Sequence, residues 1–450
     1  MDLAELARAS EQGDIDTVVV CMVDMQGRLV GKRFHARFFL DSGGGTHACD
    51  YLLANDITME PVPGYRSASW QQGYGDFELQ PDLTTLRRLP WLPGTALVIC
   101  DVLGHSGAPL AHSPRAILQQ QLEALAEQGH TMKAASELEF YCFKEPHAAI
   151  HARGYVEPAL TGHYIEDYHV LQTSREEPLM RAIRNGLEAA GIGVENTKGE
   201  WGPGQAEINV RYDRALVMAD NHVVLKNAIK EIAASQDRAV TFMAKWRDDL
   251  AGSSCHIHLS LWDLLGEQGH SFAPDEPHSM TEELRHFLGG LLHYAPEFTY
   301  LLAPNINSYK RFVAGTFAPT SCGWSRDNRT AGFRLVGEGT PSVRIECRIG
   351  GADLNPYLAY AGLIAAGIAG MQQRLEPPAP LVGDAYERED QPQLPVTLRD
   401  AVACFESSAL MREALGDAVV EHYAHAGAWE QRCHDEQVSD WELRRGFEQA

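Results

Sequence analysis

The sequence lacks any excess of basic residues, because 38 Lys and Arg stand against 61 Asp and Glu, a formal charge of -23 over 450 residues. A protein that neutralises a phosphodiester backbone needs a basic stripe, so this balance argues against a nucleic-acid binder. No run of like charges is long enough to separate a basic region from the acidic remainder. We therefore expect small-molecule substrates and no nucleic-acid partner.

Long hydrophobic runs are also missing. The first six residues, M-D-L-A-E-L, include acids and begin no apolar segment of the kind found in secretory signals. The longest apolar stretch, residues 358–371, is 14 residues long and rich in Gly and Ala. A membrane span needs about 20 residues. We expect this stretch to be a buried helix, with no export and no membrane contact.

The nine cysteines form no C-x-x-C pair and have no zinc-ligand spacing. An odd number of scattered cysteines is typical of free thiols, which predicts a reducing cytoplasm.

The common nucleotide and hydrolase motifs are absent too: there is no G-x-G-x-x-G, H-E-x-x-H or G-x-S-x-G. Residues 27–33, G-R-L-V-G-K-R, have one residue too few between the glycines for a P-loop, and Arg33 stands where Ser or Thr would bind magnesium. These absences weaken Rossmann dehydrogenase, zincin, serine hydrolase and P-loop assignments.

The sequence pattern changes near residue 112. Before it, short β-branched runs and turns predominate, and residues 17–23 and 28–34 are spaced as a hairpin. After it, Ser113 and Pro114 begin a predicted helix that stops at Gly129. Further helices are predicted over residues 177–190, 220–238 and 356–375, the last with Asn355 as N-cap. The sequence therefore predicts an α+β protein with a small β-rich domain at 1–111 and a large domain at 112–450.

Four strand-like segments carry ionisable residues on one face. Residues two apart in a strand point the same way. The polar faces are Glu137 and Glu139 in the first, Glu207, Asn209 and Arg211 in the second, His256, His258 and Ser260 in the third, and Arg344, Glu346 and Arg348 in the fourth. Each alone fits an antiparallel strand with its polar face in water, or a surface ion-pair ladder. Four together favour a shared site, because Lys would serve solubility as well.

The chemistry of these residues indicates metal-assisted phosphoryl transfer. Carboxylates with one imidazole and no thiolate suit Mg²⁺ or Mn²⁺ rather than zinc. The candidate ligands are Glu137, Glu139, Glu200, Glu207, His256 and Glu346. Arg forks match phosphate or carboxylate oxygens, and together with divalent metals they point to phosphoryl transfer from ATP.

Eight motifs in order along the chain resemble the type I glutamine synthetase family over nearly its whole length. They are F-E-L-Q-P-D at 77–82, E-L-E-F at 137–140, P-G-Q-A-E at 203–207, G-S-S-C-H-I-H-L-S-L at 252–261, N-S-Y-K-R at 307–311, N-R-T-A at 328–331, R-I-E at 344–346 and N-P-Y-L at 355–358. The resemblance implies a small β-grasp domain, a catalytic domain with a curved antiparallel sheet flanked by helices, and a dodecamer of two hexameric rings. In that assembly the β-grasp domain of one subunit completes its neighbour's site.

The resemblance also implies roles for individual residues. Glu137, His256 and Glu346 would hold one Mg²⁺ or Mn²⁺, and Glu139, Glu200 and Glu207 the other. ATP would contact Glu195, His258, Ser260, Arg334 and Arg344. Glutamate or its developing γ-phosphate would contact Gly252, Arg311, Arg329 and Arg348, with Arg329 taking part in catalysis. Members of the family phosphorylate the side-chain carboxylate of glutamate with ATP, and an amine then displaces phosphate.

The departures from the family pattern lie on the amine side. Where ammonium-using members have an Asp before Gly-Ser-Ser, residues 63–70 read P-G-Y-R-S-A-S-W, so Pro63 takes the Asp position. The flap Glu of those members is replaced by Phe317 in G-T-F-A-P. Ala251 also stands where Asn precedes the glycine. Loss of two anionic groups weakens a site for a small cation, and an aromatic flap could line space for an organic amine.

The sequence thus predicts a glutamate–amine ligase similar to γ-glutamylpolyamine or γ-glutamylethanolamide synthetases. Ethanolamine, putrescine, spermidine, a monoalkylamine or an arylamine remain open as the amine. Glu200 and Asp76 are the candidate proton acceptors. The alternatives are a glutamine synthetase that uses ammonium and a non-catalytic relative, although the six expected metal ligands are all present. Tyr386, in an acidic stretch at 376–395 expected to be an exposed loop, is not predicted to be a modification site.

Overall fold

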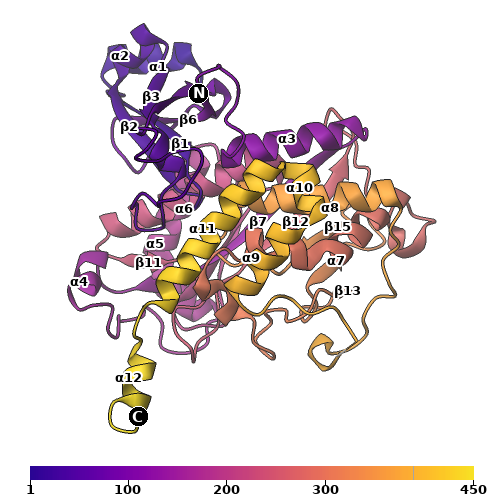
Figure 1. The fold of residues 1–450 in the computed structure, drawn as a ribbon. Coiled ribbons are helices and arrows are strands. Elements are labelled where there is room, and N and C mark those ends of the chain that lie inside the picture. The colour runs from indigo at the N-terminus through magenta and orange to yellow at the C-terminus, as the bar shows by residue number, and fades with distance from the viewer. Residues whose placement is uncertain (389) are drawn as a thin grey trace.

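The computed structural model describes residues 1–388 and 390–450, and its chain folds around two β-sheets (Figure 1). The first sheet has six strands in the order β2-β1-β6-β4-β3, with β5 paired to β6. Its strands are β1 Thr17–Val23, β2 Leu29–His35, β3 Thr46–Cys49, β4 Asp76–Pro81, β5 Arg87–Arg88 and β6 Thr95–Leu103. Helices α1 (Leu3–Gln12) and α2 (Ala36–Ser42) accompany it. The predicted hairpin is confirmed, because β1 and β2 pair antiparallel.

The second sheet has nine strands in the order β13-β14-β15-β12-β7-β9-β8, with β10 and β11 paired to β7. All described pairs are antiparallel except β13 with β14. Its strands are β7 Thr131–Phe143, β8 Val194–Gly199, β9 Gln205–Val210, β10 Asp213–Arg214, β11 Ala239–Thr241, β12 Cys255–Trp262, β13 Trp324–Arg326, β14 Phe333–Val336 and β15 Arg344–Cys347. The predicted α+β class is confirmed.

Ten helices accompany the second sheet in the described residues, and in Figure 1 α7 to α11 gather on one side of it. They are α3 Pro114–Glu127, α4 His147–Ala152, α5 Val170–Ala189, α6 Ala215–Ser235, α7 Glu282–Leu302, α8 Pro356–Gln373, α9 Leu398–Ser407, α10 Ala409–Leu415, α11 Asp417–Asp435 and α12 Asp440–Gly446. Short 3₁₀ turns occupy Asp50–Leu53, Leu83–Thr85, Pro277–Ser279, Ile306–Arg311 and Ala385–Glu387.

Two helix starts differ from the prediction. Helix α5 begins at Val170 rather than at residue 177, and Pro178 lies inside it. Proline is compatible with the first turn of a helix, which favoured the later start, but here α5 continues N-terminal to it. Helix α6 begins at Ala215 rather than at residue 220. The starts of α3 and α8 are as predicted, and the Asn355 side chain caps α8 by accepting from the Tyr357 N–H.

Helix α8 is the centre of the large core. Every residue from Pro356 to Gly370 is buried, which confirms the buried helix expected over the apolar stretch. It packs against α7 closely enough that a Cβ on Gly370 would lie 2.3 Å from the His286 carbonyl oxygen and 2.6 Å from the Gly290 Cα. Side chains at these two glycines would force the helices apart. Among the described residues, no helix is both long enough and apolar enough to cross a membrane.

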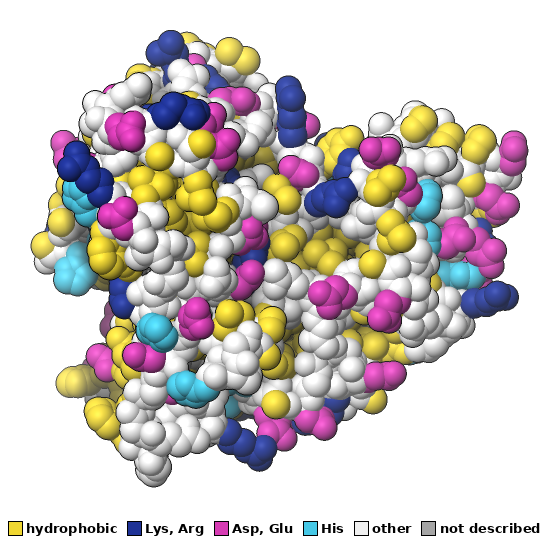
Figure 2. Space-filling view, turned by 90° about the horizontal axis from the view of Figure 1, so that it is seen from above, with side chains coloured by type: hydrophobic (Ala, Val, Ile, Leu, Met, Phe, Trp, Pro, Cys, Tyr) yellow, Lys and Arg dark blue, Asp and Glu magenta, His cyan; other side chains and the backbone are white. Residues whose placement is uncertain are grey.

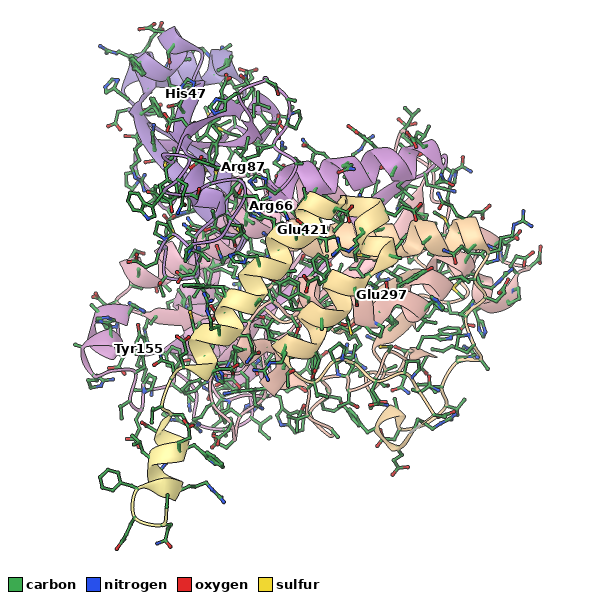
Figure 3. All side chains as sticks on the ribbon, in the orientation of Figure 1. His47, Arg66, Arg87, Tyr155, Glu297 and Glu421 are labelled. Atoms are coloured by element: carbon green, nitrogen blue, oxygen red, sulfur yellow. The ribbon has the colours of Figure 1, made fainter. Side chains whose placement is uncertain are left out.

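Buried and exposed ion pairs join the two sheet units. Arg115 of α3 pairs with Asp82 at 2.6 Å and Asp101 at 2.5 Å on the six-stranded side, and with Asp220 of α6 at 3.1 Å. Arg87 donates to the Asn221 side chain at 2.8 Å. Near the surface, Arg66 pairs with Glu421 of α11 at 2.8 Å, and both are labelled in Figure 3.

Acidic side chains do not gather in one patch on the face of the molecule seen in Figure 2. On the face seen in Figure 2, Asp and Glu lie among basic and uncharged side chains. By contrast, most of the carboxylates described next are buried.

Candidate active site

The four strands with ionisable faces are consecutive neighbours in the nine-stranded sheet, in the order β15-β12-β7-β9. Their register places Glu137 opposite His256, Glu139 opposite Glu207, and His258 opposite Glu346. Residues directly opposite each other share a face of the sheet. The predicted convergence of these side chains is therefore confirmed.

Burial excludes the alternative of a polar face in water. Glu346 is 0% exposed, Glu207 4%, Glu139 6% and His256 7%. Buried carboxylates are costly unless they are paired, protonated or bound to a cation. Such a concentration on one face is therefore typical of a site rather than of a solvated surface.

Glu137, His256 and Glu346 form the first acidic group, with potential ligand atoms within 4.8 Å of one another. The His256 Nδ1 lies 3.3 Å from a Glu137 oxygen and 3.7 Å from a Glu346 oxygen. Burial acts to raise the pKa of Glu137, but hydrogen bonds with His256 and His258 outweigh it and lower that pKa far below its ordinary value. Burial likewise acts to raise the pKa of Glu346, and the charge of Arg348 helps to bring it to about 2. Both carboxylates are therefore charged at neutral pH.

Glu139, Glu207 and His256 form the second acidic group, also within 4.8 Å. Burial and the nearby charge of Glu200 raise the pKa of Glu139 to about 8. Burial and the charges of Glu200 and Glu139 raise the pKa of Glu207 to about 9. Without a cation these carboxylates bind protons near neutral pH, so a divalent cation would compete with protons for their oxygens.

His256 shows how well the two groups fit a metal. Burial, followed by the charge of Arg348, lowers the pKa of its imidazole to about 4, so the ring is neutral at pH 7. Its Nε2 is buried and has no hydrogen-bond partner in the part of the chain that the structure describes. A neutral imidazole whose Nδ1 lies among carboxylates, and whose Nε2 is left without a partner among the described residues, is a suitable ligand for Mg²⁺ or Mn²⁺.

Glu200, the third residue predicted for the second position, is not part of either compact group. Its carboxylate pairs with the ammonium of Lys198, which also lies 3.5 Å from an Asp167 oxygen. The sequence reasoning missed Lys198, although a cation two residues before Glu200 was a usable signal for a charge pair.

Three arginines surround the first acidic group. Arg334 and Arg348 contact the two oxygens of Glu346 at 2.9 and 2.5 Å. Arg344 donates from Nε to His258 Nδ1 at 3.1 Å, and the His258 Nε2 lies 2.9 Å from Glu137. The structure thus brings together three of the residues predicted for ATP, His258, Arg334 and Arg344, with the metal candidates.

The remaining predicted residues lie on several different elements of the fold. Ser260 is on the same face of β12 as His258 and accepts from the Trp262 indole N–H at 2.9 Å. Glu195 is exposed in a β-bulge of β8, between Val194 and Asn196. Arg329 is exposed in the loop before β14. Asp76 lies on β4 of the other sheet, so it belongs to a different unit of the subunit from the two acidic groups.

Two residues predicted to touch glutamate have tight protein surroundings. The Arg311 guanidinium donates to Ser254 Oγ at 3.0 Å and to the carbonyls of Ile349 and Arg348 at 2.9 and 2.8 Å. A Cβ on Gly252 would lie 2.7 Å from the Arg311 side chain. Arg311 therefore braces the end of β15, and its guanidinium is not directed to a substrate in this conformation.

An aromatic pair lies beside the acidic groups. Trp201 directly follows Glu200, and its ring centroid is 5.9 Å from that of Phe317 in the flap, at an interplanar angle of 65°. Arg348 donates to the Phe317 carbonyl at 3.4 Å, and the Tyr386 hydroxyl donates to the Ala318 carbonyl at 3.0 Å. The described part of the stretch predicted to be an exposed loop, residues 376–388 and 390–395, is thus partly packed, since Leu381 and Ala385 are buried and Tyr386 contacts the flap. Trp201 and Tyr386 were missed as site residues because their partners are distant in sequence.

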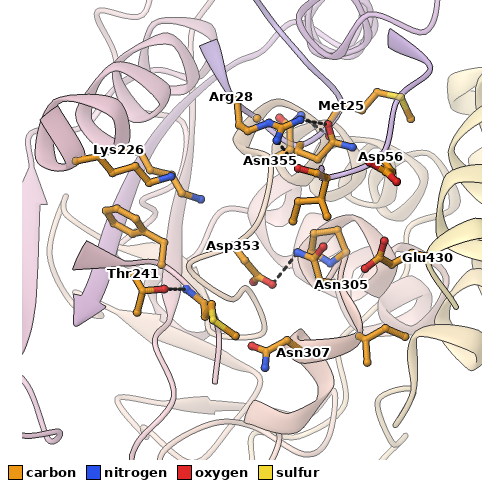
Figure 4. A pocket seen from close by; sticks show the side chains of 18 of the residues that line it. Met25, Arg28, Asp56, Lys226, Thr241, Asn305, Asn307, Asp353, Asn355 and Glu430 are labelled. Carbon is orange, nitrogen blue, oxygen red and sulfur yellow. Dashed lines mark hydrogen bonds between the residues drawn. The ribbon is translucent and has the colours of Figure 1, made fainter. Parts of the chain in front are cut away.

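A large cavity lies elsewhere in the structure. It measures about 1160 Å³ and lies between the β1–β2 turn, α6, α11 and the segment 304–310, with Lys226, Asn305 and Asp353 in its wall (Figure 4). None of the described residues that line it is among those predicted for metal, ATP or glutamate. This cavity is therefore separate from the ionisable sheet face.

The chain matches a known protein family over most of its length. The glutamine synthetase catalytic domain matches residues 111–446. The chain belongs to the glutamine synthetase family. It is 49% identical to the γ-glutamylethanolamide synthetase GlnA4 of Streptomyces coelicolor, over 100% of this chain and 96% of that protein. It is 38% identical to a glutamate–isopropylamine ligase of Pseudomonas sp, over 97% of this chain and 95% of that protein.

A solved structure, apo GmaS, superposes with a TM-score of 0.85 at 27% identity, covering 98% of this chain and 99% of that one. The predicted glutamine synthetase-like fold and family membership are confirmed.

Proposed function

We propose that the protein is an ATP-dependent ligase that phosphorylates the γ-carboxylate of L-glutamate and couples it to an organic amine, releasing ADP and phosphate. The observation that carries this proposal is the contact between Phe317 and Trp201 beside the two acidic groups. The names of two similar proteins, a γ-glutamylethanolamide synthetase and a glutamate–isopropylamine ligase, support the same reaction class.

The two acidic groups are the proposed metal sites. Glu137, His256 and Glu346 would hold one Mg²⁺ or Mn²⁺, and Glu139 and Glu207 with Glu200 the other, which requires Glu200 to leave Lys198. When bound, such ions neutralise charge on the transferring phosphoryl group. The support is the unpaired His256 Nε2 and the proton-binding tendency of Glu139 and Glu207.

The arginines are proposed to bind the anionic substrates. Arg334 and Arg344, with Glu195, His258 and Ser260, would contact ATP, while Arg348 and Arg329 would contact glutamate and its developing acyl phosphate. The buried Nε of Arg348 has no partner among the described residues, so this donor is free for a substrate oxygen. Gly252 and Arg311 would shape the glutamate site from behind, since Arg311 already bonds to Ser254.

The amine must lose a proton before it can attack. An alkylamine with a pKa near that of lysine, about 10.4, is almost fully protonated at pH 7. Glu200 is the proposed acceptor, because its carboxylate lies beside the second acidic group and one residue before Trp201. Asp76, on the other sheet, would act only on the site of a neighbouring subunit.

We further propose that the protein is a cytoplasmic dodecamer. Each subunit would consist of a small domain at residues 1–111 and a catalytic domain at residues 112–450. All nine cysteines are free thiols, and the six-stranded sheet ends at Leu103 before α3 begins at Pro114. Helix α12 projects from the body with Trp441 63% and Leu443 46% exposed, which supports an intersubunit role (Figure 1). Light scattering of the native protein tests the assembly, and a mass near the 49.7 kDa of one chain would contradict it.

Phosphate release from ATP tests the proposed reaction. We expect turnover with L-glutamate and at least one of ethanolamine, isopropylamine or putrescine, and a much lower kcat/KM with ammonium, because neither Pro63 nor Phe317 supplies a carboxylate. Mass spectrometry should detect the γ-glutamyl amide, and omission of glutamate is the control. Efficient turnover with ammonium alone would identify a glutamine synthetase instead.

A further inference from the structure

Trp201 and Phe317 are half-exposed aromatic side chains beside the two acidic groups, in which Glu139, Glu207, His256 and Glu346 are buried. Their exposed fractions are 48% and 47%, and each ring's described aromatic partner is the other. They come from separate loops, one between β8 and β9 and one after the 3₁₀ turn Ile306–Arg311. In the single chain these two large apolar groups are open to solvent beside the acidic groups, so a ligand bound there can contact them.

The backbone beside Trp201 is held by the second acidic group. The Gly202 N–H donates to Gln205 Oε1 at 2.9 Å, and Gln205 Nε2 donates to Glu139 Oε2 at 3.2 Å. A Cβ on Gly202 would lie 2.0 Å from the Tyr141 hydroxyl oxygen, so this turn fits closely against β7. The indole is therefore carried by a turn whose position is coupled to a metal candidate.

The backbone of Phe317 is held by the first acidic group. Arg348 bridges a Glu346 oxygen at 2.5 Å and the Phe317 carbonyl at 3.4 Å. Phe317 has a φ of +59°, a left-handed conformation that is uncommon for a bulky residue and persists only where contacts enforce it. The Tyr386 hydroxyl supplies a second contact through Ala318. Trp201 and Phe317 are thus each linked to one of the two acidic groups, and their rings meet at the edge of the site.

We propose that Trp201 and Phe317 form the walls of the amine subsite and select primary monoamines with a short, uncharged substituent. This inference rests on the proposed function. The ring faces can attract the ammonium form of the incoming amine, and their apolar surface can cover its alkyl or hydroxyalkyl group. Ammonium has no substituent, so it gains nothing from the apolar surface of the rings.

The charges around the pair argue against a diamine. Neither wall residue carries a carboxylate to neutralise a second ammonium group. The carboxylates next to the walls are already engaged, because Glu200 pairs with Lys198 and Glu346 pairs with Arg348. A distal ammonium group would therefore lose water without gaining a free carboxylate, so ethanolamine and isopropylamine fit better than putrescine.

The test compares Trp201→Ala, Phe317→Ala and the conservative Trp201→Phe by steady-state kinetics. Both alanine variants should raise KM for isopropylamine about tenfold, the scale of one methylene lost from an apolar pocket, with KM for ATP and glutamate unchanged. Trp201→Phe should have a KM for isopropylamine close to the wild-type value. Tryptophan fluorescence gives a second readout, since an amine-dependent change in the wild type should be absent in Trp201→Phe.

Phe38→Ala is a matched control, because Phe38 is 58% exposed and stacks on Phe34 with centroids 5.8 Å apart, but lies on α2 of the other unit. It should leave KM for isopropylamine unchanged. Unchanged KM in both alanine variants, or a preference of the wild type for putrescine, would overturn the inference while leaving the ligase reaction intact. A wild type that accepts ammonium alone would overturn both.

Discussion

Replacement of Glu346 by Gln is expected to reduce phosphate release by at least about 100-fold, the scale seen when one electrostatic contact to a transition state is removed. Glu346 is 0% exposed and contacts His256, Arg334 and Arg348 together. The amide keeps the size of the side chain but loses the charge that a cation and two guanidiniums need. Titration with Mn²⁺ should show one metal site lost or strongly weakened, which separates this effect from a change in ATP binding.

Glu338→Gln is the matched control for Glu346→Gln. Glu338 also has an arginine and a histidine partner, with Arg326 at 2.5 Å and His278 at 3.2 Å, but it lies outside the acidic groups. This variant should retain activity and Mn²⁺ binding. If Glu346→Gln folds and binds Mn²⁺ as the wild type does, the assignment of Glu346 to a metal site is wrong.

The acidic site could be predicted because strand geometry determines which side chains share a face. Glu137 and Glu139 point the same way in any extended segment, whatever their partners. The order β15-β12-β7-β9 could not be read from alternation, yet it is what places His258 opposite Glu346. The residue types suggested the site, and the strand pairing made it compact.

Side-chain direction in loops was beyond the sequence. Arg311 matches a family motif, but its guanidinium turns inward to Ser254, a choice set by packing at the end of β15. Trp201 and Phe317 meet only because the β8–β9 turn and the flap approach each other in the fold. Contacts of this kind depend on tertiary structure and have no periodic signature.

The Arg115 network was equally hidden, because its acidic partners come from separate elements. Asp82 caps a 3₁₀ turn, Asp101 lies on β6 and Asp220 on α6. Nothing in the helical pattern of α3 distinguishes Arg115 from a solvated arginine in the first turn. Its side chain is nevertheless only 3% exposed, and it joins the two sheet units.

Arg115→Met is expected to destabilise the protein by about 3 to 5 kcal/mol, the cost of leaving buried charges without their partner. Methionine retains much of the apolar stem of arginine, so the loss of stability measures the contribution of the guanidinium group. A lower midpoint should appear in thermal unfolding, with faster hydrogen exchange at β6 and α3. The matched control is Arg66→Met, because Arg66 also joins the two units but is 89% exposed beside Glu421. Exposed pairs contribute little, so this control should unfold close to the wild type.

The pH dependence of the Arg115→Met effect gives the sharper test. Burial acts to raise the pKa of Asp82, but hydrogen bonds from Thr84 and Arg115 lower it below 3.8. Burial raises the pKa of Asp220 above 3.8 even though Arg115 opposes this. Without Arg115 both pKa values rise. A carboxyl group whose folded pKa exceeds its unfolded value destabilises the fold at higher pH, and this penalty disappears as pH falls below the unfolded value. The deficit of Arg115→Met relative to wild type should therefore be largest at pH 7 and shrink toward pH 4. A deficit that does not change with pH would mean that Arg115 stabilises the protein through packing and not through its pairs with the three carboxylates.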